Sequence, residues 1–235
     1  MNFLLLILTF FIFLSSQANE NIRSDNSIKN IIKEYLLQNP EVIIESLERY
    51  RNNQEIEMEE NKKATLNSYY DNKKYEVLPF TGNDKGKIIV TEFIDYNCGY
   101  CKKTLLTINK LLEKYKDVKV VFVDFPILSE TSYSAAKAAV AASKQNAYFQ
   151  FHSELLNNRK DINESYLLEL AKSFNLDLVK FKKDMESNDT KNLIDDNIKL
   201  ARDLNIRGTP TFIIDKKIYP GAYSIEKLEE ILNRI

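Results

Sequence analysis

The sequence predicts an α/β domain that is interrupted by an all-helical insertion and preceded by an N-terminal helical segment. Three observations support this fold class. Two apolar, β-branched runs flank an amphipathic pattern within residues 87–125, helical patterns fill residues 134–205, and strand signals return only after them. Because parallel strands need a crossover connection, the first group indicates a right-handed βαβ unit. Strand signals on both sides of a helical stretch indicate an insertion, which we place at residues 130–205.

The first 18 residues have the pattern of a secretory signal peptide. Residues 3–14 are apolar except for Thr9, and this run is too short for a membrane-spanning helix, which needs roughly 20 residues. Small residues at Ser16 and Ala18 fit the positions that a signal peptidase reads, so we expect cleavage before Asn19. No Lys or Arg precedes the run, so an uncleaved anchor is one alternative and a buried N-terminal helix is another.

Composition and export together set the chemical context of the two cysteines. The 33 basic and 34 acidic residues give a net charge of −1, which excludes a strongly basic nucleic-acid binder. Two cysteines are too few for a disulfide framework, and a chain of 235 residues can be held by its own core. Export would place the thiols in an oxidising compartment, which we expect to be the periplasm.

Residues 19–74 form the predicted N-terminal helical segment. Apolar side chains recur at helical spacing over residues 28–50, and Asn-Pro-Glu at 39–41 is typical of a restarted helix with Asn39 as its N-cap. Residues 51–63 are almost wholly polar, which indicates a solvated connecting helix or a flexible linker. Because residues 28–50 would bury little surface alone, we expect them to pack on the main domain or on another copy of themselves.

The main domain is predicted to span residues 75–235. Its strands are apolar and β-branched, which is typical of buried strands, and its helices carry their apolar residues on one side. The predicted elements are a strand (87–94), a helix (98–115), a second strand (117–125), the helical insertion (130–205), two short strands (211–215 and 218–219) and a C-terminal helix capped by Ser224.

The stretch TEFIDYNCGYCKK, residues 91–103, contains both cysteines of the chain. Cys98 falls at the predicted junction of strand and helix, and Cys101 follows one turn later on the same face. Residues three apart on a helix have Cβ atoms about 5–6 Å apart, close enough for a disulfide after a small adjustment. We therefore interpret the pair as a redox couple in which Cys98 is the nucleophile and Cys101 the resolving thiol.

The position of Cys98 at a helix N-terminus favours its thiolate by a limited amount. The helix field supplies about 0.3–1 kcal/mol and at most ~2, whereas one pKa unit corresponds to about 1.36 kcal/mol. A larger shift of the Cys98 pKa would need hydrogen bonds from the amides of Tyr100 and Cys101 or from the Cys101 thiol. No His lies between the cysteines, so we expect a less oxidising couple than a Cys-Pro-His-Cys site.

Glu92 is the third candidate residue of this site. It lies six residues before Cys98, within the apolar strand that leads to the cysteines. A carboxylate inside such a strand is costly unless it is used or solvated. We interpret Glu92 as a proton relay to Cys101, and the alternative is a strand-end acid that reaches solvent.

Redox chemistry is not the only use that two neighbouring cysteines can have. Structural zinc needs four ligands, and beyond the two cysteines the chain offers only one distant His, His152, so we expect no zinc site and no other cofactor. Copper(I) needs only two or three soft ligands, so copper coordination remains an alternative. A structural disulfide closing so short a loop would constrain the unfolded chain very little. His152 lies among aromatic residues and is interpreted as a packed or capping side chain.

The motifs around the cysteines resemble the DsbA-like thiol–disulfide oxidoreductases of the thioredoxin superfamily. Glu92-x5-Cys98-Gly-Tyr-Cys101, YFQFHSELL, IRGTPTFII and PGAYSIEKLEEIL carry this resemblance, which extends from about Lys87 to the C-terminus. It implies a thioredoxin fold in which a cis-proline loop faces the cysteine pair. That role falls on Thr209-Pro210, and substrate binding is implied for these two residues and for Gly99 and Tyr100.

The N-terminal segment resembles that of the suppressor-of-copper-sensitivity C (ScsC) proteins, which are relatives of DsbA. The stretch IIKEYLLQNPEVIIESLERY carries this likeness. Some relatives use such a segment to oligomerise and then behave as isomerases, so the resemblance implies a homo-oligomer formed through residues 28–50. The Gly-Tyr dipeptide between the cysteines and the Thr before Pro210 are similar to bacterial disulfide isomerases.

Three hypotheses for function follow from these patterns. The first is an exported enzyme that forms, reduces or isomerises disulfides through Cys98 and Cys101. Its expected partners are cysteine-containing exported proteins and a membrane redox partner that recharges the couple, and no nucleic acid. The second is a copper-binding or copper-protective periplasmic protein that uses the same thiols. The third is an oligomeric holdase that acts through residues 28–50, with the cysteines incidental.

Overall fold

The computed structural model describes residues 27–158 and 161–234. The predicted signal peptide, residues 1–18, lies outside these ranges. The chain divides into two compact units, with the boundary between Glu57 and Met58. Within the described part of the chain, no helix is both long enough and apolar enough to cross a membrane.

The described part of the first unit is helical. It consists of a helix over residues 27–38 and the first half of α2 (Glu41–Asp71), separated by a turn at 39–40. The side-chain amide of Asn39 donates to the Tyr35 carbonyl at 2.9 Å, so it satisfies a carbonyl group at the end of the first helix. Residues 51–63 are helical and mostly exposed, which makes them a solvated helix and not a flexible linker.

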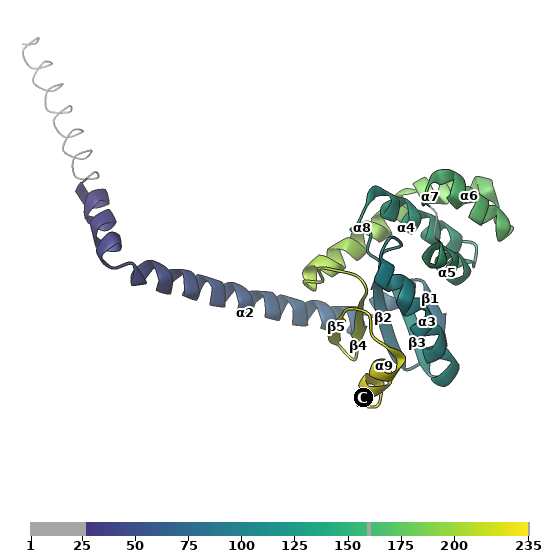
Figure 1. The fold of residues 1–235 in the computed structure, drawn as a ribbon, viewed down its shortest axis with the longest axis horizontal. Coiled ribbons are helices and arrows are strands. Elements are labelled where there is room, and N and C mark those ends of the chain that lie inside the picture. Colours follow the sequence, from purple (N-terminus) through teal and green to yellow (C-terminus); the bar gives the residue numbers. More distant parts are fainter. Residues whose placement is uncertain (1–26, 159–160, 235) are drawn as a thin grey trace, which may run out of the picture. The chain divides into compact units, whose positions relative to one another are not determined.

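The second unit is built on a five-stranded mixed sheet (Figure 1). The strand order is β1-β3-β2-β4-β5; only β2 and β3 are parallel, and the other neighbours are antiparallel. The predicted βαβ unit is therefore confirmed. The strands are β1 (Phe80–Gly82), β2 (Ile88–Ile94), β3 (Val118–Asp124), β4 (Thr211–Ile214) and β5 (Lys217–Pro220).

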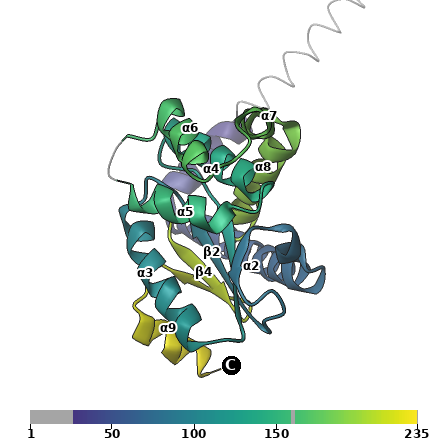
Figure 2. The ribbon, with the colours of Figure 1, turned by 90° about the vertical axis from the view of Figure 1, so that its right-hand side faces the viewer.

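Helices cover the sheet and fill the insertion. Helices α3 (Gly99–Lys114) and α9 (Ile225–Leu232) lie together on one side of the sheet (Figure 2). Ser224 caps α9, as predicted, by accepting from the Lys227 N–H. The insertion between β3 and β4 consists of α4 (Glu130–Ser143), α5 (Tyr148–Asn157), α6 (Glu164–Ser173), α7 (Leu178–Glu186) and α8 (Asn188–Asp203).

The two faces of the sheet bury two separate apolar clusters. Val90 and Phe122 belong to the cluster that includes α3, α9 and most of the insertion, whereas Phe93 and Val121 belong to the other. This division follows from the alternation of side chains along a strand. The cysteine pair lies in the first cluster, with the helical insertion.

The boundary of the second unit differs from the predicted start at residue 75. The last turns of α2 carry Leu66 and Tyr69 into the second cluster, where both are buried. The Tyr69 hydroxyl also hydrogen bonds to Thr91 Oγ1 of β2 at 3.0 Å. Because these side chains complete a face of the sheet, the unit extends back to Met58. Because residues 51–63 before them are almost wholly polar, the sequence pattern did not indicate that Leu66 and Tyr69 belong to this core.

Strand β1 was not predicted, and it ends at a glycine with a specific role. Gly82 has φ +88°, and a Cβ there would lie 2.6 Å from both the Leu112 side chain and the Val118 carbonyl oxygen. Such a backbone conformation favours glycine, and the close approach leaves no room for a side chain. A strand of three residues has too few positions to show a period of two.

Candidate functional site

Strand β2 leads into helix α3, and the cysteine pair lies at the start of this helix. A turn over residues 95–97 follows the strand, and Cys98 takes an extended conformation as the N-cap of α3, with φ −80° and ψ 113°. The Cys98 N–H donates to the Asp95 carbonyl at 3.0 Å, and the Cys98 carbonyl accepts from Lys102 N–H at 3.2 Å. Cys98 keeps 6% of its surface exposed and Cys101 none. The nucleophile of the prediction is thus the more accessible thiol.

The surroundings of Cys98 stabilise its thiolate. A hydrogen bond from the Cys101 thiol lowers the pKa of Cys98 most, and burial opposes it. The Thr209 side chain and the N–H groups of Cys101 and Tyr100 lower the pKa further, to about 5. The direct hydrogen bonds that a large shift requires are therefore present. They add to the modest field of the helix N-terminus.

Cys101 has the opposite electrostatic character. Its hydrogen bond to Cys98 raises the pKa of the Cys101 thiol well above its usual range, and burial and the nearby Glu92 carboxyl raise it further. The backbone N–H of Asp95 has the opposite effect and lowers the pKa of Cys101. At neutral pH the pair therefore holds one proton, on Cys101.

Glu92 is a buried carboxyl and does not reach solvent. It lies on β2 between Phe122 of β3 and Phe212 of β4, and only 2% of its surface is exposed. Burial raises the pKa of Glu92 to about 8, while a hydrogen bond from Thr104 lowers it. The structure thus rules out the strand-end alternative and brings Glu92 within electrostatic range of Cys101.

Thr104 is a site residue that the sequence analysis missed. It lies on α3 one turn after Cys101, and its side chain is buried. Its hydroxyl is 2.5 Å from Glu92 Oε1 and 2.8 Å from the Cys101 carbonyl oxygen. One hydroxyl proton can satisfy only one of these acceptors at a time. The only signal in the sequence was its spacing of three residues from Cys101.

The loop before β4 lies against Cys98. The Thr209–Pro210 peptide bond is cis, and the Thr209 carbonyl oxygen is 3.1 Å from Cys98 Sγ, from which it accepts only while Cys98 is a protonated thiol. The Pro210 carbonyl accepts from Gly221 N–H at 2.8 Å, which fixes the loop to the chain after β5. The cis-proline loop and the cysteine pair, which the resemblance implies face each other, are therefore adjacent in the structure.

The surface next to Cys98 is open on the α3 side. A Cβ placed on Gly99 would meet no atom within 4 Å. Tyr100 is 63% exposed, and Lys103 Nζ lies 5.0 Å from the centre of its ring. The structure thus brings both Gly99 and Tyr100 to the surface beside the nucleophile.

His152 is packed within the core, as predicted, and is not part of the cysteine site. Its Nδ1 lies 3.2 Å from the Tyr96 hydroxyl, and burial lowers the pKa of His152 to about 3. The Tyr148 hydroxyl donates to Asp124 Oδ1 at 3.1 Å, and burial raises the pKa of Asp124 to about 7. This polar network joins the insertion helix α5 to the ends of β2 and β3.

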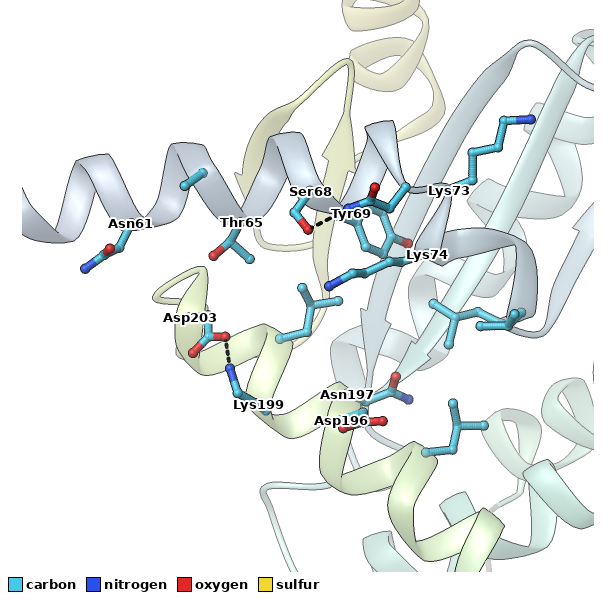
Figure 3. Close-up of a pocket in the computed structure, with 16 residues that line it drawn as sticks. Asn61, Thr65, Ser68, Tyr69, Lys73, Lys74, Asp196, Asn197, Lys199 and Asp203 are labelled. Atoms are coloured by element: carbon cyan, nitrogen blue, oxygen red, sulfur yellow. Dashed lines mark hydrogen bonds and ion pairs between the residues drawn. The ribbon is translucent and has the colours of Figure 1, made fainter.

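Among the described residues there is no cluster of metal-ligating side chains, and a cavity of the second unit lies apart from the cysteine pair. In the described parts of the chain, no three His, Cys, Asp or Glu side chains gather in a way that could hold a metal ion. A cavity of 750 Å³ lies between the last turns of α2 and helix α8 (Figure 3). None of its lining residues belongs to the cysteine site.

A mixed sheet that presents a Cys-x-x-Cys pair at a helix N-terminus, beside a cis-proline loop, defines a redox-active thioredoxin-fold domain. Comparison with known families agrees. A family model described as Thioredoxin matches residues 74–234, and one described as Copper resistance protein ScsC N-terminal domain matches residues 26–57. The chain therefore belongs to the thioredoxin superfamily, in its DsbA-like, ScsC-type branch of thiol–disulfide oxidoreductases.

Individual relatives support the same placement. The thiol-disulfide exchange protein alpha-DsbA2 from Wolbachia pipientis is 29% identical with a TM-score of 0.68, covering 74% of this chain and 95% of that one. ScsC from Proteus mirabilis in a transitional conformation is 26% identical with a TM-score of 0.64, covering 90% and 96%. The Na(+)/H(+) antiporter NhaA 3 from Salinispora tropica is 30% identical over 63% of this chain. The chain spans only 23% of that antiporter's length.

Proposed function

We propose that this protein is an exported thiol–disulfide oxidoreductase that acts on cysteine-containing exported proteins through Cys98 and Cys101. One observation carries the proposal. Cys98 is an N-cap residue whose thiolate is stabilised by direct hydrogen bonds, and it lies beside the Thr209–Pro210 loop. Stabilised thiolates at helix N-termini are the reactive form of cysteine in disulfide exchange.

In the reducing direction, the Cys98 thiolate attacks one sulfur of a substrate disulfide. A bond forms between Cys98 and that sulfur, and the other substrate sulfur leaves as a thiolate that takes a proton. Cys101, once deprotonated, then attacks the Cys98 sulfur. The Cys98–Cys101 disulfide forms, the second substrate thiolate leaves, and two electrons have passed to the substrate. The oxidising direction is the reverse, and a membrane redox partner would recharge the couple.

Glu92 is the proposed proton relay for Cys101. The Cys101 thiol must lose its proton before it can attack, and the surroundings strongly favour the protonated form. With a pKa of about 8, the buried carboxyl is mostly protonated at neutral pH, and its ionised fraction, which grows as the pH rises, is the form that accepts the proton. Thr104 holds the carboxyl in place during the transfer.

The couple is expected to be intermediate in oxidising power. A low nucleophile pKa stabilises the reduced form, and a pKa of about 5 lies between that of thioredoxin at about 7 and that of DsbA at about 3.5. The reduction potential of Cys98–Cys101 should therefore lie between about −270 and −120 mV. This agrees with the expectation of a less oxidising couple than Cys-Pro-His-Cys.

Residues 28–50 are the proposed homo-oligomerisation segment. Its apolar side chains are exposed in the described structure and include Ile31, Tyr35, Ile44 and Tyr50, each more than half exposed. Contiguous exposed apolar surface of this kind marks interaction sites. Light scattering should show a smaller assembly when residues 19–57 are removed, and an unchanged number of chains per particle would contradict the role.

The direct test of the redox proposal compares the wild type with Cys98→Ser and Cys101→Ser. Reduction of insulin and refolding of scrambled ribonuclease should both be lost in Cys98→Ser. Cys101→Ser should instead accumulate a mixed disulfide with the substrate, since the attacking thiolate is kept and the resolving thiol is gone. Activity that survives Cys98→Ser would refute the proposal.

Copper(I) binding by the same two thiols is a second candidate. The observation that favours it is the match of residues 26–57 to a family described as a copper resistance protein. Two adjacent thiolates are suitable soft ligands for copper(I). Anaerobic titration of the reduced protein with copper(I) should then saturate at one ion per chain, and no binding in the wild type would remove this candidate.

A further inference from the structure

Asp95 is a buried carboxylate next to the cysteine pair that the mechanism above does not use. It follows β2 directly, and only 1% of its surface is exposed. Each of its two carboxylate oxygens accepts two hydrogen bonds. Oδ1 accepts from Asn97 N–H at 2.8 Å and Ser132 Oγ at 2.7 Å, and Oδ2 accepts from the N–H groups of Ile127 and Leu128 at 2.9 and 3.0 Å.

The main chain of Asp95 contacts the cysteine turn. Its carbonyl oxygen accepts from Cys98 N–H at 3.0 Å, and its backbone also lowers the pKa of Cys101. One residue therefore joins the cysteine turn, through its main chain, to a segment more than 30 residues away, through its side chain.

That distant segment is the loop 126–129, between β3 and α4. Ile127 and Leu128 in this loop are 42% and 54% exposed, although both are apolar. The Asn97 side-chain amide also reaches this region, with hydrogen bonds of 2.8–3.0 Å to three hydroxyls of Ser129, Thr131 and Ser132. Residues 95–97, directly before Cys98, thus hold the loop while its apolar side chains remain exposed.

We propose that Asp95 is a positioning residue that fixes the loop 126–129 beside Cys98, so that Ile127 and Leu128 support a polypeptide substrate while its disulfide meets the nucleophile. This inference rests on the proposed oxidoreductase function and names how that function would favour polypeptide substrates over small disulfides. A small disulfide needs only access to Cys98, whereas a polypeptide must also find apolar surface next to it.

The pattern of hydrogen bonds explains why a carboxylate is needed. All four partners of the side chain are donors, two on each oxygen. In Asp95→Asn, the amide nitrogen must face either the N–H groups of Ile127 and Leu128 or the N–H of Asn97. A donor would then oppose a buried donor in either orientation, and the loop or the turn would move to relieve it.

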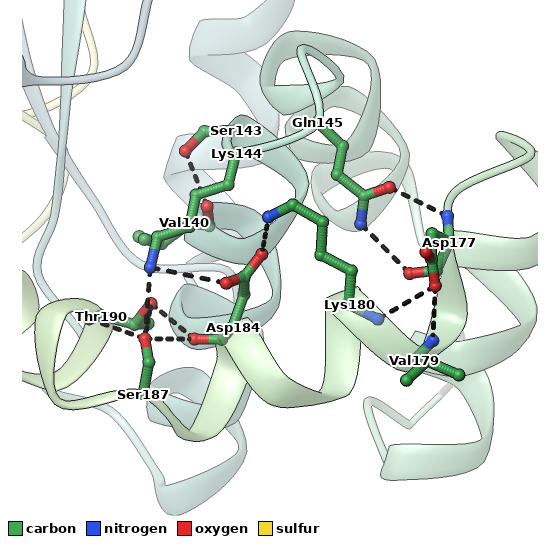
Figure 4. A network of polar contacts seen from close by, with 10 residues as sticks. All are labelled: Val140, Ser143, Lys144, Gln145, Asp177, Val179, Lys180, Asp184, Ser187 and Thr190. Atoms are coloured by element: carbon green, nitrogen blue, oxygen red, sulfur yellow. Dashed lines mark hydrogen bonds and ion pairs between the residues drawn. The ribbon is translucent and has the colours of Figure 1, made fainter.

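The test compares Asp95→Asn with the same substitution at Asp177. Asp177 caps α7 and accepts from the N–H groups of Val179 and Lys180 with one oxygen, Oδ1 (Figure 4). Asn can keep that oxygen, so Asp177→Asn should be silent. Asp95→Asn should raise KM for scrambled ribonuclease about tenfold, the scale of one buried donor left unpaired, with the rate toward oxidised glutathione kept within about threefold.

Further variants keep the test decisive. Replacing Ile127 and Leu128 together by Ser should raise KM for scrambled ribonuclease, and adding Asp95→Asn to that variant should raise it little more, because both changes act through one loop. If Asp95→Asn does not fold, Ser132→Ala can replace it, because it removes one of the four hydrogen bonds to the Asp95 carboxylate. It should raise KM for scrambled ribonuclease by a smaller factor and leave the rate toward oxidised glutathione unchanged.

Two results would overturn the inference. Equal losses toward scrambled ribonuclease and oxidised glutathione would mean that Asp95 supports only the cysteines. Unchanged KM in Asp95→Asn or in the Ile127 and Leu128 variant would mean that the loop does not contact the substrate. A wild type that exchanges with neither substrate would instead contradict the proposed function itself.

Discussion

Replacing Glu92 by Gln should make the reduced protein more stable and a poorer oxidoreductase. The Glu92 carboxyl is 2% exposed, and burial raises its pKa from 4.5 to about 8. Below pH 4.5 the carboxyl is neutral in both the folded and the unfolded chain, so its ionisation does not affect stability. Between pH 4.5 and 8 it ionises when the chain unfolds but stays protonated in the fold, and this favours unfolding.

The size of the effect follows from that pKa shift. Each pH unit in this window costs the fold about 1.36 kcal/mol, so at pH 7 the Glu92 carboxyl destabilises it by about 3.4 kcal/mol. The side-chain amide in Glu92→Gln would keep an oxygen for the Thr104 hydroxyl but would leave amide donors buried, at a cost of about 1–3 kcal/mol. We therefore expect a net gain of about 1–2 kcal/mol at pH 7.

Urea unfolding of the reduced proteins between pH 5 and pH 9 measures this effect. The amide cost does not depend on pH, so the difference in unfolding free energy should grow by about 1.4 kcal/mol per pH unit and level off above pH 8. Glu113→Gln, at an exposed position of the same helix as the cysteines, is the control and should add no such slope. A flat difference between pH 5 and pH 8, or a less stable Glu92→Gln at pH 8, would refute the reasoning.

Three other predictions follow from the site and the fold. The Cys98 thiolate should titrate near pH 5 by ultraviolet absorbance, and Cys101→Ala should move that midpoint upward because it removes the strongest hydrogen bond. Thr104→Val should raise the pKa of Glu92 further and shift the pH dependence of mixed-disulfide resolution upward, whereas Thr104→Ser should not. Gly82→Ala should lower the unfolding free energy by more than about 1 kcal/mol, because a Cβ would lie 2.6 Å from two neighbours.

Each of these predictions has a result that contradicts it. A Cys98 midpoint unchanged by Cys101→Ala would show that the two thiols do not share a hydrogen bond. Equal pH profiles for Thr104→Val and Thr104→Ser would show that the hydroxyl does not act on Glu92. A Gly82→Ala protein as stable as the wild type in urea would show that the end of β1 can adjust.

Local patterns were enough to predict the framework of the site. The cysteine spacing, the apolar strand before it and the amphipathic helix after it all involve neighbours in sequence, and the structure confirms each element within one or two residues. The strand pattern placed Glu92 near the cysteines but left open whether its carboxyl reaches solvent, and only the structure shows that it is buried.

The partners of the site residues could not be predicted in the same way. Asp95 looks like an ordinary turn residue in the sequence, since its role depends on Ile127 and Leu128, which the parallel pairing of β2 and β3 brings to the same edge. Thr104 is one of many polar residues on an amphipathic helix, and only its buried hydrogen bond to Glu92 of β2 distinguishes it from the others. Contacts of this kind depend on register and packing, which periodicity does not determine.

The burial of Leu66 and Tyr69 has a practical consequence for dissecting this protein. A shortened chain starting at residue 75 would lose two large buried side chains and the hydroxyl that hydrogen bonds to Thr91, so part of one face of the sheet would be exposed. Such a fragment would be less stable than the intact unit, and a resulting loss of activity could be mistaken for a catalytic contribution from upstream residues. Starting the fragment at Met58 avoids that error.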